Sequence, residues 1–134
     1  MTALSSFAEI KVLDLLFRNT AYTAPNAYMG LFTSDPTDSA SGTEVAGNGY
    51  ARVQIDNKMA AATTGVDNST IVNNADITFP TATGGAFGTV THIGIFDAST
   101  SGNLLAHGAL SASRVISDGD TFQINSGSLT ITID

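Results

Sequence analysis

Hydrophobic and polar positions change their spacing once along the chain, near Pro25. Before this point, apolar residues dominate positions 8–17 and are interrupted by charge only at Glu9, Lys11 and Asp14. After it, apolar residues tend to alternate with polar ones, in short runs separated by Gly, Asn and Asp. This change predicts one helix followed by a series of strands and turns.

The helix is predicted over Ser6–Arg18. Ser6 and Glu9 have the spacing of a capping box, in which the serine hydroxyl accepts from the Glu9 amide and the Glu9 carboxylate reaches back. Asp14 and Arg18 have the i,i+4 spacing of an ion pair along a helix. The two ends of the helix are therefore predicted from side chains that favour them.

The apolar part of this helix is wider than packing on one sheet requires. It covers on the order of 220° of the circumference, whereas a stripe of about 100° is enough for one contact face. Each large side chain left in water forgoes roughly 1.5–3 kcal/mol. Either a loop of the same chain or a neighbouring subunit would cover the excess. The sequence thus predicts a candidate subunit interface formed by Ile10, Val12, Leu13, Leu15, Leu16 and Phe17.

The rest of the chain is predicted to form antiparallel strands. The segments with strand character are Asn26–Thr33, Thr43–Ala46, Tyr50–Ile55, Ala75–Phe79, Thr89–Phe96, Leu104–Leu110, Val115–Ile116, Thr121–Ile124 and Leu129–Ile133. Asn-Gly is a strong hairpin signal, so the segments on either side of Gly47–Gly49 are predicted to pair with each other. Residues 56–69 are left open between a loop and a short helical turn.

Two of these segments, Thr89–Phe96 and Leu104–Leu110, are apolar on both faces and are predicted to be central strands. The fold class is therefore mainly β, an antiparallel β-sandwich of jelly-roll-like or immunoglobulin-like type, preceded by one N-terminal amphipathic α-helix. At 134 residues the chain fits a single domain over 1–134. In this division the helical region is 1–19 and the sandwich is 26–134.

Charge and composition exclude several classes of partner. Twelve acidic and five basic side chains give a net charge of −7, and the basic residues are scattered. A nucleic-acid or anionic-membrane surface needs clustered Lys and Arg, so neither partner is expected. There is no cysteine, which excludes thiolate catalysis and disulfides. The first 20 residues show neither a signal-peptide pattern nor a membrane span, so membrane insertion is not expected either.

Few residues offer catalytic or metal-binding chemistry. His92 and His107 fall on successive predicted strands, and together with Asp97 they would resemble a metal or acid–base site. We favour the simpler interpretation, histidines bonded locally within strands, because no further ligands follow at a recognisable spacing. Acidic residues near Asp35 and Asp118 are interpreted as turns and not as calcium ligands. The sequence predicts no catalytic, cofactor-binding or metal residues, no cofactor and no enzymatic activity.

Several strings, in their order along the chain, resemble a family of small virion proteins of tailed bacteriophages that are commonly labelled tail fibre proteins. These strings are LLFRNTAYTAP (Leu15–Pro25), LFTSDPTD (Leu31–Asp38), GTEVAGNGYAR (Gly42–Arg52), NNADITFPTATGGAFGTVTHIGIFDA (Asn73–Ala98), GNLLAHGAL (Gly102–Leu110) and SDGDTFQINSGSLTITID (Ser117–Asp134).

The resemblance implies a non-enzymatic structural protein of the virion, tail-fibre-like or an accessory particle subunit. Assembly would use the β-sandwich and the N-terminal helix, with copies of the same chain and other phage structural proteins as partners. A capsid decoration (cement) protein on the phage head and a receptor- or glycan-binding module of a tail tip remain as alternatives. A host surface receptor would be a partner in the latter case. The expected location is the virion, after synthesis in the host cytoplasm.

Overall fold

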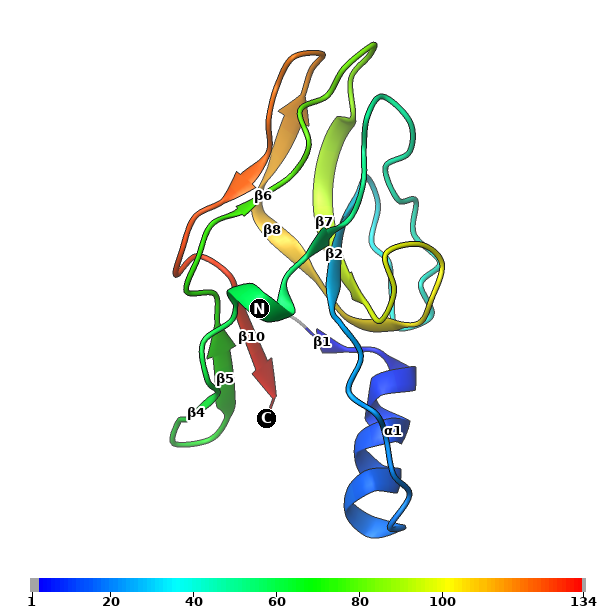
Figure 1. Cartoon of the computed structure of the whole chain (residues 1–134), viewed down its shortest axis with the longest axis vertical. Coiled ribbons are helices and arrows are strands. Elements are labelled where there is room, and N and C mark those ends of the chain that lie inside the picture. The colour runs from blue at the N-terminus through cyan, green and yellow to red at the C-terminus, as the bar shows by residue number, and fades with distance from the viewer. Residues whose placement is uncertain (1–2, 134) are drawn as a thin grey trace.

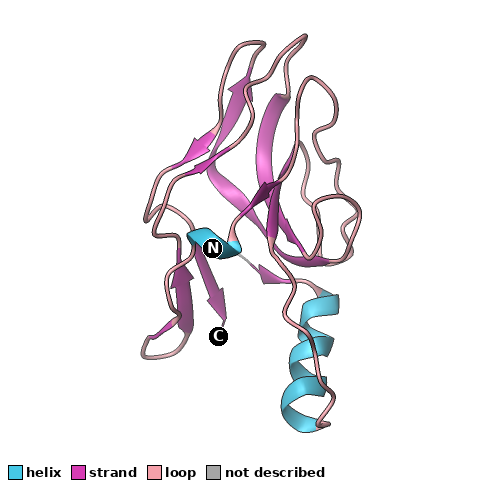
Figure 2. Ribbon diagram, viewed as in Figure 1, coloured by secondary structure: helices cyan, strands magenta, loops and turns pink. Residues whose placement is uncertain are grey.

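The computed structural model describes residues 3–133 and is mainly β, with antiparallel strands and one α-helix near the N-terminus (Figures 1 and 2). This confirms the predicted fold class at that level. The elements in chain order are β1 (Ala3–Leu4), α1 (Ser6–Phe17), β2 (Tyr28–Phe32), β3 (Val53–Gln54), the 3₁₀ turn η1 (Asp56–Lys58), β4 (Thr63–Thr64), β5 (Ser69–Val72), β6 (Ile77–Thr78), β7 (Gly88–Phe96), β8 (Leu104–Ile116), β9 (Gln123–Ile124) and β10 (Thr130–Ile133).

The largest sheet has five strands in the order β1-β8-β7-β2-β3. Strand β7 lies at its centre, as predicted for Thr89–Phe96, and pairs with β2 on one side and β8 on the other. Strand β8 is bordered by β1 only at Ala106 and His107. The prediction that Leu104–Leu110 is a central strand thus holds only over this short stretch. Along the rest of β8, the edge that faces away from β7 has no neighbouring strand in the described sheets.

Two smaller sheets, β10-β5-β4 and β6-β9, supply the opposite side of the hydrophobic core. Main-chain bonding extends the β6-β9 pair, because Phe79 N donates to Phe122 O at 2.9 Å. The core side chains come from both sides: Met29, Leu31, Val90, Ile93, Ile95, Ala106 and Ile116 from the large sheet, and Ile77, Phe79, Phe122 and Leu129 from the segments facing it. This arrangement of facing sheets is the feature that the sandwich prediction anticipated.

The predicted hairpin between Thr43–Ala46 and Tyr50–Ile55 is wrong. Both segments pair with β2 instead of with each other: Glu44 bridges to Phe32, and Val53 pairs with Met29. The turn itself forms, since Tyr50 N donates to Gly47 O at 2.9 Å. The two arms therefore follow one another along the same edge of β2.

Side chains, and not a backbone ladder, join these two arms. Arg52 makes two bonds of 2.7 Å to the carboxylate of Glu44, and the Tyr50 hydroxyl donates to Glu44 Oε1 at 2.7 Å. Burial and the bond to Glu44 raise the pKa of Tyr50 well above its ordinary value of 10.0. A Cβ at Gly30 would lie 2.6 Å from Glu44 Oε1, so only glycine leaves room for this network.

Further differences concern where elements begin. The helix does not open the fold, because β1 precedes it and pairs with β8. The segments predicted as Leu104–Leu110 and Val115–Ile116 are parts of one strand, β8. The undecided residues 56–69 contain η1 and β4, and β5 was not predicted. Strands β1 and β4 have two residues each, too few for a periodicity to be read, and β5, with the sequence Ser-Thr-Ile-Val, does not alternate apolar and polar residues.

Candidate functional site

Helix α1 is attached to the sheet at its N-terminal end. Its N-cap is Ser5, whose hydroxyl oxygen accepts from Ala8 N at 3.2 Å. The predicted cap at Ser6 is thus displaced by one residue. The reason is that Ser5 is still part of the extended chain: its amide donates to Leu105 O at 2.9 Å, and its hydroxyl donates to Leu104 O. The helix can start only after this contact with β8 is complete.

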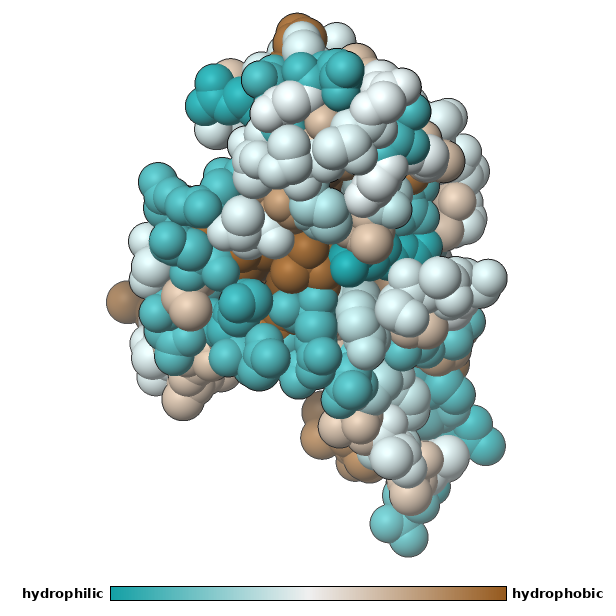
Figure 3. All heavy atoms as spheres, turned by 45° about the horizontal axis from the view of Figure 1, so that its top comes forward, coloured by the Kyte–Doolittle hydropathy of each residue, from teal (hydrophilic) through white to brown (hydrophobic). Residues whose placement is uncertain are grey.

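Beyond this attachment the helix extends away from the sheets (Figure 1). Ala8 is its single buried residue. Large apolar side chains gather at this end of the molecule, where Figure 3 shows brown atoms low in the view. All members of the predicted interface are exposed, from 41% for Val12 to 77% for Phe17, and the set is Ile10, Val12, Leu13, Leu15, Leu16 and Phe17.

A segment of the same chain packs against α1, but on the side that carries Phe7 and Lys11 and not on the six exposed apolar residues. The strand-like stretch from Asn19 to Ala27 runs back beside the helix (Figure 1). Within it, the Tyr22 ring meets Phe7 edge-on at 6.5 Å, and the Lys11 ammonium lies 5.3 Å from the Phe7 ring centre. Burial, with a contribution from the charge of Asp97, raises the pKa of Tyr22. The alternative that a loop of the chain covers the apolar excess therefore fails for the described residues.

The charges on α1 are balanced within the helix. Glu9 and Asp14 are matched by Lys11 and Arg18 at its end, and Arg18 Nη1 lies 2.8 Å from Asp14 Oδ1. With two acidic and two basic side chains in residues 6–18, the whole net charge of −7 belongs to the rest of the chain. The exposed helix is therefore a neutral, apolar projection from an acidic body.

The histidines do not form a site with Asp97. They lie on the adjacent strands β7 and β8, but each has its own partner: His92 Nδ1 is 2.8 Å from Thr91 Oγ1, and His107 Nε2 is 2.9 Å from Asp38 Oδ1. Asp97 accepts from the amide and side chain of Asn103. Across residues 3–133, no group of three His, Cys, Asp or Glu side chains is placed to hold a metal ion.

Both acidic segments that were interpreted as turns are turns. Asp35 Oδ1 accepts from Thr37 N at 2.9 Å, and Asp120 Oδ2 accepts from Ser117 N at the same distance. Gly119 has φ +89°, a conformation that glycine adopts without strain. These carboxylates are engaged by backbone amides of their own loops, which is the usual role of Asp in a turn.

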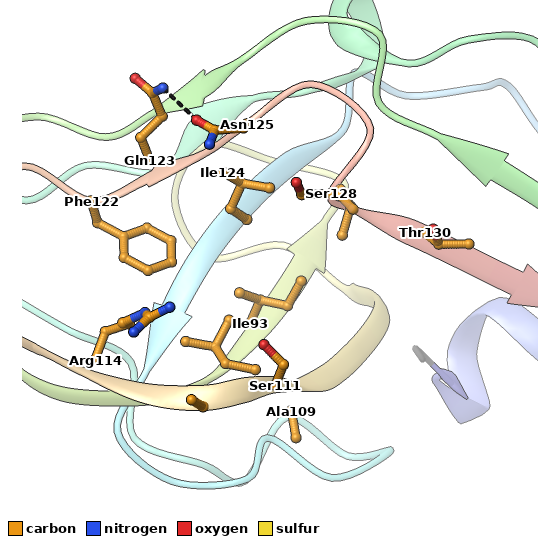
Figure 4. A pocket seen from close by; sticks show the side chains of 13 residues that line it. Ile93, Ala109, Ser111, Arg114, Phe122, Gln123, Ile124, Asn125, Ser128 and Thr130 are labelled. Carbon is orange, nitrogen blue, oxygen red and sulfur yellow. Dashed lines mark hydrogen bonds between the residues drawn. The ribbon is translucent and has the colours of Figure 1, made fainter.

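A groove of approximately 390 Å³ lies between β8 and the segment that contains β9 and the start of β10 (Figure 4). Arg114 and Phe122 lie toward one end of it, Ile93 and Ile124 in the middle, and Thr130 toward the other end. Figure 3 shows a hollow in which apolar atoms are surrounded by polar ones. This groove could not be predicted from the sequence, because no local pattern shows that residues 109–114 face residues 122–130.

No helix among the described residues is long and apolar enough to cross a membrane.

The comparisons with known proteins agree with the architecture of a structural protein. Among proteins with curated descriptions, none matches this chain. A family model, Gp80, described as podophage GP4 fiber I protein gp80, matches residues 3–132. This match covers nearly the whole chain, including α1 and every sheet described above. The chain therefore belongs to the Gp80 family of podophage fibre proteins, a family of phage structural proteins of the fibre type.

Proposed function

We propose that this chain is a non-enzymatic subunit of a phage tail fibre that assembles with further copies of itself through helix α1. The observation that carries the proposal is the exposure of six large apolar side chains on one projecting helix. Complete burial of a fully exposed side chain of this kind gains roughly 1.5–3 kcal/mol, and each of the six would gain the part that corresponds to its exposed fraction. In the single chain this apolar surface stays in contact with water, whereas an interface between subunits would bury it.

Charge favours a second copy as the occupant of this surface. The acidic bodies of two copies repel each other, since each carries the net charge of −7 outside residues 6–18. Contact through the projecting, neutral helices brings apolar side chains together while the bodies stay apart. Identical subunits that meet in this way usually form closed cyclic assemblies. The family description supports a place in a fibre over a place on the capsid.

The experiment is a charge substitution in the centre of the surface. Leu16→Asp should convert the assembly of the purified protein into monomers, measured by light scattering, because a carboxylate would be buried without a partner. Val66→Asp is the matched control, since Val66 is 99% exposed in the loop between β4 and β5, away from the helix. Circular dichroism should show the same strand content in both variants.

Two results would contradict the proposal. One is an unchanged assembly in the Leu16→Asp protein, which would place the contact between subunits elsewhere. The other is a wild-type protein that stays monomeric at high concentration, which would mean that α1 meets a different phage protein.

A further inference from the structure

The groove beside β8 lies between two strand edges that have no neighbouring strand. Strand β8 is paired along one side by β7, but on the other side, within residues 3–133, β1 borders it only at Ala106 and His107. Strand β9 is paired with β6 alone in the described sheets. The space between these edges is the groove of Figure 4. Open edges of this kind readily accept an additional strand.

Among the described residues, the outer edge of β8 beyond His107 has no neighbouring strand. The pairing of β7 with β8 contains a bulge. His92 is opposite Ala109 and Val90 is opposite Arg114, so the four residues 110–113 of β8 have only Thr91 opposite them. These residues lie outside the regular ladder with β7. Apart from ladder bonds, no backbone hydrogen bond between described residues involves positions 108–115. The N–H and C=O groups that this part of β8 directs to its outer edge have no strand beside them in the described sheets, so an incoming chain could pair with them.

An added strand would lie on the same edge of β8 as β1. Strand β1 runs antiparallel to β8 and occupies its outer edge up to His107, and the groove begins on the same strand at Ala109. The wall is formed there by Ala109, Ser111 and Ala112, whose small exposed side chains let another backbone approach closely. The existing β1–β8 contact thus shows the geometry that a longer contact would follow.

The charge of the groove indicates the chemistry of its occupant. Arg114 is its single charged lining residue. Its side chain is exposed and has no hydrogen bond or ion pair with any described residue. The floor is apolar, with Ile93, Phe122 and Leu129 buried beneath the opening. An apolar floor with an unpaired guanidinium at one end fits a chain that carries a carboxylate.

We propose that this groove binds an extended, acidic segment of another protein by strand addition to β8, with Arg114 pairing a carboxylate of that segment. The proposal goes beyond self-assembly through α1 and does not depend on it, because the groove and the helix use different residues. One subunit would then hold its own copies through the helix and a different protein through the sheet edge.

The test is selection from a random dodecapeptide library on the immobilised protein. Enriched peptides should contain Asp or Glu together with alternating apolar residues. Their affinity should fall by about tenfold or more in Arg114→Glu, as expected when a charge pair becomes repulsive. Ser111→Trp should also remove binding by filling the groove, because the Ser111 side chain points into it (Figure 4). Lys58→Glu and Val66→Trp are the matched controls, and both should bind as the wild type does.

A second measurement separates strand addition from binding of side chains alone. N-methylation of alternate amides in the best peptide should abolish binding for one set of amides and spare it for the other, because only one edge of the peptide faces β8. The proposal is wrong if no peptide is enriched over a blank surface, if the groove variants bind normally, or if N-methylation has no effect. Binding of purified lipopolysaccharide that both groove variants abolish, without peptide enrichment, would identify a carbohydrate site instead and would also overturn it.

Discussion

Strand β7 and helix α1 are both rich in large apolar side chains, but they use them in opposite ways. In β7, Val90, Ile93 and Ile95 are at most 4% exposed and pack in the core between the two sides, and Phe96 is equally buried in a smaller cluster with Phe32 and Leu104. In α1, by contrast, the large apolar residues after Ala8 remain in contact with water. The difference shows that the hydrophobicity of β7 is required by the fold of one chain. That of α1 exceeds this requirement and is available for contact with another molecule.

The largest effect is expected from truncation of a side chain in β7. Ile95→Ala should lower the free energy of unfolding by about 2–5 kcal/mol, because it removes buried methyl groups and leaves a cavity. Ile95 is 3% exposed and belongs to the central core cluster. Denaturant unfolding of the monomer measures this loss. A cost below about 1 kcal/mol would mean that the core relaxes around the cavity, and the comparison with α1 would lose its basis.

An intermediate effect is expected from the polar network beside the core. Because its pKa is raised, Tyr50 keeps its proton in the folded protein at a pH where the unfolded chain has lost it. Its contribution to stability is therefore fully present below pH 10.0, the ordinary pKa, and is lost as the pH rises above that value.

Tyr50→Phe tests this dependence. The variant should be less stable at neutral pH by on the order of 1 kcal/mol, since it loses the bonds to Glu44 and Leu31. Its stability should then decline less steeply than that of the wild type between pH 9 and 11, measured by urea unfolding at each pH. If the stability of both proteins declined equally with pH, the loss at alkaline pH would come from groups other than Tyr50. Tyr28→Phe is the matched control and should show the same pH dependence as the wild type.

The smallest effect on stability is expected on the helix. Leu16→Ala should change the unfolding free energy of the dilute monomer by no more than about 0.5 kcal/mol, as is usual for exposed positions. The same variant should weaken self-association in sedimentation experiments. If Leu16→Ala destabilises the monomer as much as Ile95→Ala does, α1 packs on its own body in solution, and the contrast between helix and strand disappears.

Elements with a long, regular pattern could be predicted from the sequence. Helix α1, the central strand β7 and the closing strand β10 have enough residues for their periodicity to be clear. The six interface residues could be singled out because the width of the apolar helix surface is a local property. The structure leaves them exposed, and their role in assembly remains a proposal.

Pairing partners could not be predicted in the same way, because distant side chains decide them. The Asn48-Gly49 pair correctly indicated the turn. The segments on either side of it both pair with β2, however, because Glu44 bridges to Phe32 and Arg52 bonds to Glu44. Similarly, β9 and β10 are joined by a short turn but enter different sheets. The groove between β8 and β9 depends on these pairings, and for that reason no sequence pattern indicated it.

The contact between Ser5 and Leu104 has a consequence for the timing of assembly. It joins residues 99 positions apart, so the direction of α1 is set only when most of the chain has been synthesised. Contacts of this sequence separation form late, since a long loop must close first. A growing chain therefore presents its apolar helix in no fixed orientation while it is still on the ribosome. If subunits associate through α1 as proposed, the helix would reach its final orientation for that contact only after most of the chain has folded.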